Sequence, residues 1–191
     1  MRLLMLMSFL FSQNIYAQLT TNVVWTNDGA TPAADVIYYN SNKQLDWNNF
    51  YGKPPADNGI TAALTVSGFG YSANIKTING KGQLNIQVYC YFNKNKSWVK
   101  SGRNTAYILT HEQHHFDISY ICAAIFVDKL QATAFSTTNY STWLPKIYNE
   151  SCDIMNKMQN DYDGQTKNGQ LKDEQNRWNS LIVAKISAAT R

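Results

Sequence analysis

The segment from residue 107 to residue 117 has the residue types and the spacing of a metal site. It contains all 3 histidines of the 191-residue chain and reads His-Glu-x-x-His from His111 to His115. In a helix, residues four apart lie about 40° apart around the axis and about 6 Å apart along it, so both rings can face one Zn²⁺. Glu112 is rotated about 100° from His111, which places its carboxylate where a general base can take a proton from a water on the metal. The segment therefore predicts a hydrolytic zinc site with His111 and His115 as ligands and Glu112 as the base.

The third ligand of this predicted site must come from elsewhere in the chain. A catalytic zinc usually has three protein ligands, and because no histidine lies outside the segment, an acid is expected, with Tyr or Cys as weaker alternatives. Asp117 lies about 200° around the helix from His115 and cannot reach the same metal, and His114 projects about 60° off the ligand stripe, as a supporting or surface residue would. Glu150 is similar in position to the second-helix ligand of thermolysin-like zinc proteases, although the Asp that follows it comes one residue early. Asp163 follows a predicted helix and could fold back onto the metal-binding segment.

Helices must carry most of these residues. Residues 106–134 contain no Gly or Pro and are apolar on most faces, which predicts a central buried helix. A second helix is predicted over about 143–161, with Pro145 in its first turn. After a break at 164–169, a third is predicted over about 171–188, with Trp178, Leu181, Ile182 and Ile186 toward one side.

Short β-rich runs precede the helices, at 23–25, 36–39 and 60–66. The clearest hairpin joins 72–78 to 83–89 through the turn residues 79–82, and its alternation predicts one buried face. That face would carry Ala73 and Ile75 on the first strand and Leu84, Ile86 and Val88 on the second. Strands first and helices after predict a single α+β domain over residues 18–191: an N-terminal, antiparallel-rich sheet, a buried active-site helix and two further helices.

The composition supports one packed domain and excludes several classes of protein. Hydrophobic residues make up 44% of the chain and charged residues 16%, which excludes disorder, collagen and coiled coil. A net charge of +4 is far from the basic loading of a nucleic-acid-binding protein. We therefore expect no nucleic acid among the partners.

Residues 1–17 have the pattern of a secretory signal peptide. Arg2 precedes the apolar run Leu3–Phe11, and Ala17 is the expected cleavage point. That run is too short to cross a bilayer, which needs roughly 20 residues, and no later segment is long and apolar enough. We expect a secreted or periplasmic protein without a membrane span.

The cysteines are an odd set in an exported chain. At most one internal bridge can form among Cys90, Cys122 and Cys152, and a bridge between Cys122 and Cys152 would join two helices. The alternative, which we favour, is three buried small hydrophobic residues.

Runs at 45–55, 63–71, 94–99, 111–118, 158–166 and 175–178 together carry a family resemblance. The chain resembles, over about residues 44–182, a family of bacterial secreted proteins of unknown function that are described as predicted secreted zinc-dependent proteases. The resemblance implies a zincin-like metallopeptidase domain that binds Zn²⁺. The late segment of the family reads Tyr-Asp-x-Glu-Thr-x-His-Gly, and the matching residues here are Tyr162, Asp163, Gln165, Thr166, Asn168 and Gly169.

Two of these matches depart from the family pattern, because Gln165 replaces an acid and Asn168 replaces a histidine. If that histidine is the family's third ligand, this chain has lost it. The retained Asp163 is then the preferred third ligand, ahead of Glu150.

Two functions follow from these observations. The first is a secreted zinc-dependent peptidase acting on a peptide or protein, which would lie along an edge strand at about 83–92, with Tyr162 helping to hold the oxyanion. The second is a non-catalytic secreted binding module on a zincin scaffold with a degraded metal site. Its motives are Gln165, Asn168 and the 12 Tyr and 5 Trp residues that could contact a ligand.

Overall fold

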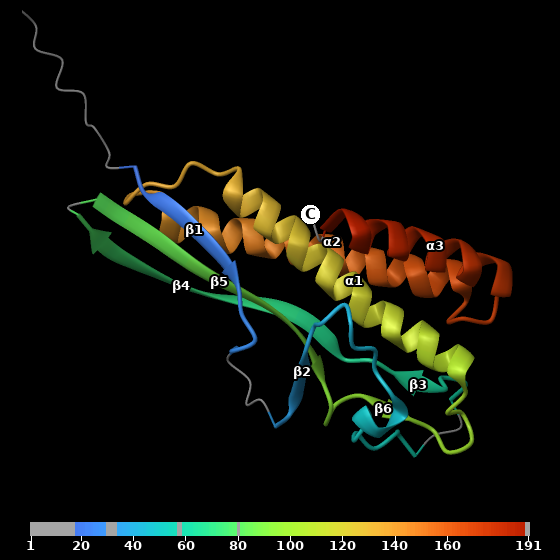
Figure 1. The fold of residues 1–191 in the computed structure, drawn as a ribbon. Helices are drawn as coiled ribbons and strands as arrows, with labels where there is room; N and C mark the ends of the chain where they lie inside the picture. The colour runs from blue at the N-terminus through green and yellow to red at the C-terminus, as the bar shows by residue number, and fades with distance from the viewer. Residues whose placement is uncertain (1–17, 30–33, 57–58, 80, 190–191) are drawn as a thin grey trace, which may run out of the picture.

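The computed structural model describes residues 18–29, 34–56, 59–79 and 81–189. In Figure 1 three helices lie on one side of a long β-hairpin. This arrangement confirms the predicted α+β class. The predicted signal peptide, residues 1–17, lies outside the described residues.

The larger sheet is built around one long central strand, β5 (Lys81–Asn93). β4 (Ser67–Ile78) pairs with it antiparallel along its whole length, which confirms the predicted hairpin. On the other side, β1 (Thr20–Trp25) pairs parallel with the first half of β5, and β2 (Val36–Tyr38) pairs antiparallel with its end. Both sides of β5 are therefore occupied.

A second, two-stranded sheet joins β3 (Ala63–Leu64) to β6 (Trp98–Val99). The predicted run 60–66 thus contains a much shorter strand than expected. A short 3-10 helix, η1 (Trp47–Asn49), is capped by Asp46, whose side chain accepts from Asn48 N.

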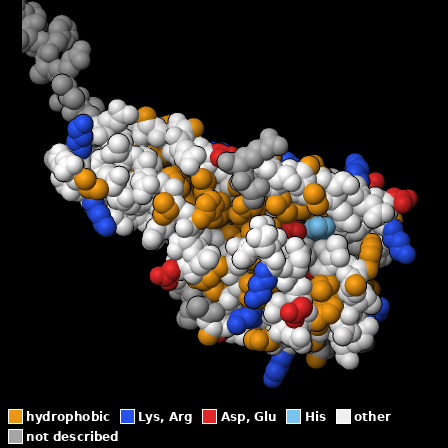
Figure 2. All heavy atoms as spheres, viewed as in Figure 1, with side chains coloured by type: hydrophobic (Ala, Val, Ile, Leu, Met, Phe, Trp, Pro, Cys, Tyr) orange, Lys and Arg blue, Asp and Glu red, His pale blue; other side chains and the backbone are white. Residues whose placement is uncertain are grey.

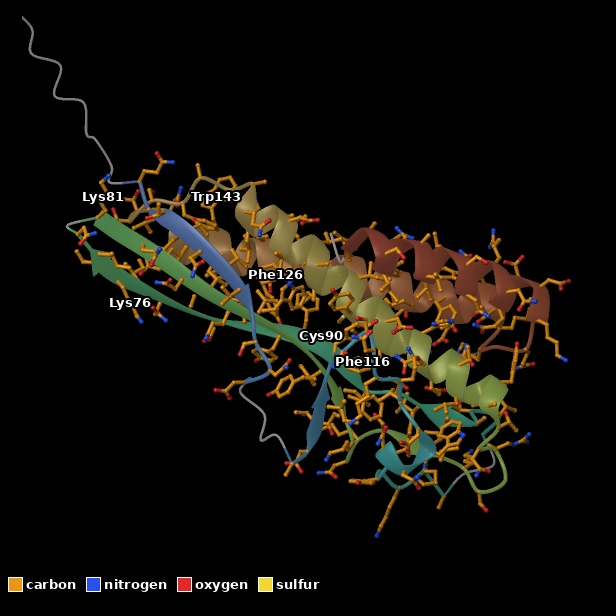
Figure 3. The ribbon with its side chains drawn as sticks, viewed as in Figure 1. Lys76, Lys81, Cys90, Phe116, Phe126 and Trp143 are labelled. Atoms are coloured by element: carbon orange, nitrogen blue, oxygen red, sulfur yellow. The ribbon has the colours of Figure 1, made fainter. Side chains whose placement is uncertain are left out.

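The helix α1 (Ala106–Gln131) is the centre of the molecule, since it contacts β4 and β5 on one side and the other two helices on the other. The Thr105 Oγ1 caps its start by accepting from Ile108 N. Phe116 and Phe126 point from α1 toward the sheet (Figure 3), where they contact Phe92 and Phe69. The prediction of a central buried helix is confirmed.

The predicted buried face of the hairpin is confirmed on β5 only. Leu84, Ile86 and Val88 are buried, whereas Ala73 is exposed and Ile75 is 39% exposed. The helices cover β5 and β4 as far as Tyr71, which contacts Phe126 and Tyr148. Beyond Tyr71, β4 is an edge strand that the helices leave uncovered.

The second helix, α2 (Tyr140–Thr166), is longer than predicted at both ends. It begins before Trp143, so Pro145 lies inside the helix rather than in its first turn. It also continues past Gly164 and ends only where Lys167, Asn168 and Gly169 all adopt positive φ. Asp163 is therefore part of α2, not of the loop after it.

The third helix, α3 (Lys172–Ala189), packs Trp178 and Ile182 inward as predicted, with Ile186 half-buried. Leu181 is 41% exposed, so that part of the prediction is wrong. The three cysteines form no bridge; Cys90 and Cys122 are buried as expected, whereas Cys152 is only half-buried, so the prediction is wrong for that residue. Among the described residues, no helix combines the length and the apolar composition that crossing a bilayer requires.

Two isoleucines of the hairpin, one on each strand, test whether β5 is buried and the end of β4 is uncovered. Ile86→Ala empties a site that is 0% exposed on the central strand, so we expect a loss of about 2–5 kcal/mol in the free energy of unfolding. Ile75→Ala, the matched change on the uncovered edge strand, should cost less than about 1 kcal/mol. Urea unfolding followed by circular dichroism measures both, and equal losses would contradict the uncovered edge.

Candidate metal centre

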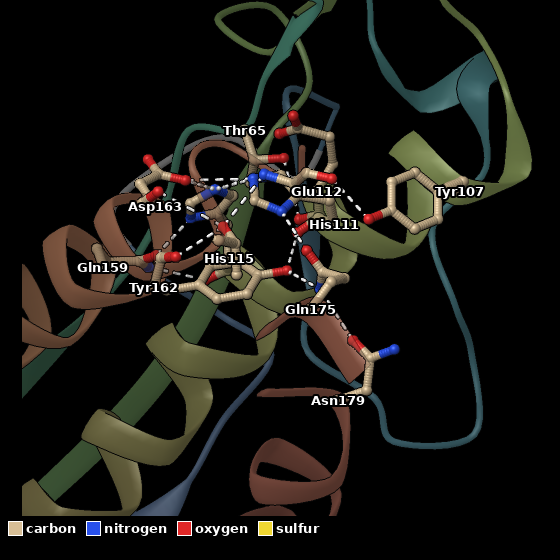
Figure 4. Close-up of polar contacts among 12 residues, drawn as sticks. Thr65, Tyr107, His111, Glu112, His115, Gln159, Tyr162, Asp163, Gln175 and Asn179 are labelled. Carbon is tan, nitrogen blue, oxygen red and sulfur yellow. Dashed lines mark hydrogen bonds and ion pairs between the residues drawn. The ribbon is translucent and has the colours of Figure 1, made fainter. Parts of the chain in front are cut away.

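Three side-chain atoms from two helices meet at one point. His111 Nε2 and His115 Nε2 lie 3.3 Å apart, and each lies 3.2 Å from Asp163 Oδ1 (Figure 4). The histidines project from successive turns of α1, as their spacing predicts, and Asp163 comes from α2, which packs against α1. The three residues form a group that could hold a metal ion.

Gln159 determines which nitrogen of His115 faces Asp163. Its amide Nε2 donates to the main-chain oxygen of His115, an atom that can only accept. The amide oxygen of Gln159 is thereby turned toward His115 Nδ1, which must carry the proton and donate. The neutral ring of His115 then has a bare Nε2.

Gln175 does the same for His111, through Tyr162. The Tyr162 hydroxyl donates to the main-chain oxygen of His111 and so must accept from Gln175 Nε2, at 2.6 Å. The amide oxygen of Gln175 lies 2.9 Å from His111 Nδ1, which therefore donates to it. His111 also has a bare Nε2, and its ring stacks on Tyr162.

Three hydrogen-bond acceptors thus face one another without a donor among them. Such an arrangement is repulsive unless a cation lies between them, and two imidazole nitrogens with one carboxylate oxygen are a usual donor set for zinc. Ligands 2.0–2.1 Å from a tetrahedral zinc are separated by about 3.3 Å, which is the spacing of these three atoms. The residues present fit a metal ion of this kind.

The electrostatics of the group favour a cation. Burial by itself would raise the pKa of Asp163, but the adjacent rings of His111 and His115, which donate to this carboxyl when they are protonated, hold its pKa well below the usual range. Burial lowers the pKa of His115, whereas Asp163, Glu112 and the bond to Gln159 raise it, with a net upward shift. The negative groups that favour a proton on His115 would attract a metal ion equally.

Glu112 lies beside this group with an unsatisfied oxygen. Its side chain is only 4% exposed, and Oε2 has no hydrogen-bond partner among the described residues. A buried carboxylate oxygen without a donor is costly. Glu112 is the residue for which the sequence predicts the role of proton acceptor, and that role stays a prediction.

His111, His115 and Asp163, which we call the metal-binding group because they could hold a metal ion, line one groove of about 830 Å³ together with Glu112. One wall is the segment 60–67, which includes β3; the other is made by α2 and the loop 168–170. Thr65 Oγ1 donates to Glu112 O, and Ser67 Oγ donates to His115 O. These two bonds hold the β3 wall at a fixed place above α1.

Gly169 is required on the opposite wall for two reasons. Its φ is +77°, and a Cβ there would lie 3.2 Å from His111 Nδ1. The Tyr107 hydroxyl also donates to Gly169 O, at 2.6 Å, which ties the loop to α1. The backbone of this loop therefore packs directly against the ring of a candidate ligand.

The other sequence candidates lie elsewhere. Glu150 pairs with Lys129, which is about 21 Å along α1 from His115, so it is not the third member of the group. His114 is buried, not at the surface: its Nδ1 contacts Asp117 and its Nε2 contacts Asn179. Asp117 points away from the metal-binding group, as predicted.

Tyr162 does not reach the groove, so its expected role at the oxyanion is wrong. It is fully buried, and burial raises the pKa of its hydroxyl, which keeps its proton for His111 O. Tyr162 is thus a positioning residue for His111.

The prediction that substrate binds along the strand 83–92 is also wrong, because this strand is at the centre of the sheet and pairs with a neighbouring strand on each side. The strand edge at the groove belongs to β3. The hydrogen bonds between β3 and β6 involve the residues on either side of Ala63; Ala62 O, for example, accepts from Lys100 N. Ala63 itself is therefore at a position whose N–H and C=O point away from β6.

Gln165 and Asn168, the two departures from the family pattern, lie in different parts of the structure. Gln165 Oε1 accepts from Arg177 and from Trp178 Nε1 of α3, so this residue lies outside the metal-binding group. Asn168 lines the groove. The replacement of an acid by Gln165 therefore removes nothing from the group.

The sequence analysis named neither Gln159 nor Gln175 as a site residue. Gln159 stands four residues before Asp163, a spacing that puts both on one face of a helix, and this was the available signal. Gln175 has no comparable signal, because only the packing of α3 on α1 brings it to His111.

No family model, no curated protein and no solved structure matches the chain. The resemblance described from the sequence therefore stays a prediction.

Replacement of Gly169 tests whether the loop positions His111. Gly169→Ala should weaken zinc binding at least tenfold, because the new methyl group meets the His111 ring. Gly102→Ala is a matched control: its φ is +74°, with nothing within 4 Å of a Cβ, so it has the same backbone strain without the ring contact. Competition with a chromophoric chelator measures both affinities, and equal losses would show that strain alone is responsible.

A second pair of variants tests the role of Gln159. Gln159→Leu removes the acceptor of His115 Nδ1–H and should weaken zinc binding by about 10- to 100-fold. Gln165→Leu, the same change on the same helix but facing α3, should leave zinc affinity unchanged. Isothermal titration with zinc compares them; unaltered affinity in Gln159→Leu would refute the positioning role.

Proposed function

We propose that the chain is a secreted, zinc-dependent peptidase with a zincin-like active site. The observation that carries the proposal is the convergence of three acceptors, His111 Nε2, His115 Nε2 and Asp163 Oδ1, beside the unsatisfied carboxylate of Glu112. All four residues line one groove, so the group is open to a substrate. The family resemblance points to the same activity.

The metal would be held by His111, His115 and Asp163. When bound there, zinc supplies a Lewis acid that polarises the scissile carbonyl and lowers the pKa of a water to about 7. Glu112 Oε2 accepts the proton of the attacking water and passes it to the amine that leaves. Gln159 and Gln175 keep both imidazoles in the tautomer that binds metal.

The peptide would lie in the groove along β3. The N–H and C=O of Ala63 point away from β6, and an extended chain can pair with them as an added strand. Leu64, Ile108 and Met155 line the groove beside the metal-binding group and offer apolar contact to substrate side chains. An extended peptide bound in this way would continue beyond the metal-binding group in both directions, as the substrate of an endopeptidase does.

The non-catalytic alternative rests on Gln165, on Asn168 and on the supply of Tyr and Trp residues. Because Gln165 faces α3, only Asn168 remains as a change in the groove itself. The two functions differ in metal content and in the effect of Glu112, and both are measurable.

Elemental analysis and peptide hydrolysis together test the proposal. We expect near one zinc per chain, lost in His115→Ala, because that variant removes a ligand. Glu112→Gln should keep the zinc and lose peptidase activity by about 10²- to 10⁴-fold, since only the proton acceptor is removed. A protein that takes up no zinc even in zinc-supplemented medium would support the binding module, and full activity in Glu112→Gln would exclude the proposed base.

A further inference from the structure

The two ends of the groove differ in charge. Because Thr65 contacts Glu112 and Ser67 contacts His115, the segment 60–67 runs in the same direction as α1. Ile60 and Thr61 therefore lie toward the start of α1, and Ser67 lies at the other end with Met155 and Asn156. The metal-binding group is between the two ends.

Arg103 and Lys172 lie together at the end where α1 starts. Arg103 precedes Tyr107 by about one turn, Lys172 follows Gly169 by three residues, and the bond from Tyr107 Oη to Gly169 O joins the two segments. Both side chains line the groove and both residues are exposed. We call this part of the groove, with Arg103, Tyr107 and Lys172, the cationic end.

Neither cation is neutralised within the described part of the chain. Lys129, Lys157 and Arg177 each have a carboxylate within 3.2 Å, whereas Arg103 and Lys172 have no such partner among the described residues. The acids that line the groove, Glu112 and Asp163, belong to the metal centre. The cationic end thus presents two unpaired positive charges to whatever occupies the groove.

We propose that the groove selects peptides that place a carboxylate at the cationic end, with Arg103 and Lys172 as specificity-determining residues. This inference rests on the proposed peptidase function. His111 lies about 8 Å along the axis from the start of α1, which corresponds to two or three residues of an extended peptide. The carboxylate is therefore an acidic side chain, or the C-terminal carboxylate, two or three residues from the bond that is cut.

Lysines far from the groove allow the effect of net charge to be tested separately. Figure 2 shows that the face around the end of β1 and the adjoining part of α1 is mainly hydrophobic, with Val24 and Trp25 exposed there. Lys76 and Lys81 lie at the far end of the hairpin (Figure 3). Lys76 and Lys81 therefore serve as a control for the effect of net charge alone.

Binding to the zinc-loaded Glu112→Gln variant separates recognition from cleavage. The probes are blocked eight-residue peptides of Ala and Leu with an uncharged fluorophore, in which a single Glu is moved through every position, plus a neutral peptide with a free C-terminal carboxylate. Fluorescence anisotropy should show at least fivefold tighter binding for Glu at one position, or for the free carboxylate, than for the neutral peptide. Raising the salt concentration should reduce that preference because exposed charges are screened.

Removal of both cations is the decisive comparison. Arg103→Gln/Lys172→Gln should abolish the preference and leave the affinity for the neutral peptide unchanged, whereas the control Lys76→Gln/Lys81→Gln should keep it. Equal binding of all probes, or a preference that survives Arg103→Gln/Lys172→Gln, would overturn the inference. If the wild-type protein cleaves no peptide but this charge-dependent binding is found, the peptidase proposal fails and the carboxylate site stands.

Discussion

Two glutamine amides determine the tautomers of the candidate ligand histidines, because each amide oxygen accepts from the Nδ1–H of one ring. Each amide is oriented by a main-chain oxygen of α1 that can only accept: directly for Gln159, and through the Tyr162 hydroxyl for Gln175. The proton on Nδ1 leaves Nε2 bare, and both Nε2 atoms face Asp163. The ability of the group to hold a cation would depend on these bonds, because reversal of either amide would turn an N–H toward His Nδ1.

The position of α1 between the sheet and two helices makes such precise pairing necessary. A helix covered on several sides cannot leave polar side chains without partners, and this one carries a buried polar segment from His111 to Asp117. Asp117 accepts from Tyr39 and Gln113 and contacts His114, while His114 reaches Asn179 of α3. Asn179 in turn accepts from Gln175, so the same hydrogen bonds that satisfy the back of the helix also support His111 at the front. Glu112 Oε2 is the exception: it has no hydrogen-bond partner among the described residues, and Glu112 lines the groove.

The groove combines elements that are far apart in the sequence into one surface. β3 contributes a strand edge, α2 and the loop after it contribute the opposite wall, and the cationic end lies at one side of the metal-binding group. In the proposed function, the strand edge would offer main-chain hydrogen bonds that do not depend on side chains, whereas the charges of Arg103 and Lys172 would discriminate between ligands. Catalysis and selection would therefore be carried out by different parts of the same groove.

The sequence by itself determined the helical spacing of His111, Glu112 and His115, since the geometry of an α-helix is local and needs no tertiary contact. The alternation in β5 and the long apolar run of α1 likewise predicted the core strand and the central helix. The resemblance favoured Asp163 over Glu150 on a matched segment, but only the packing of α2 on α1 brings its carboxylate to the histidines. Gln175, the edge at β3 and the exposure of Ile75 could not be predicted, because each depends on which element covers which, and strand order and helix packing leave no local pattern in the chain.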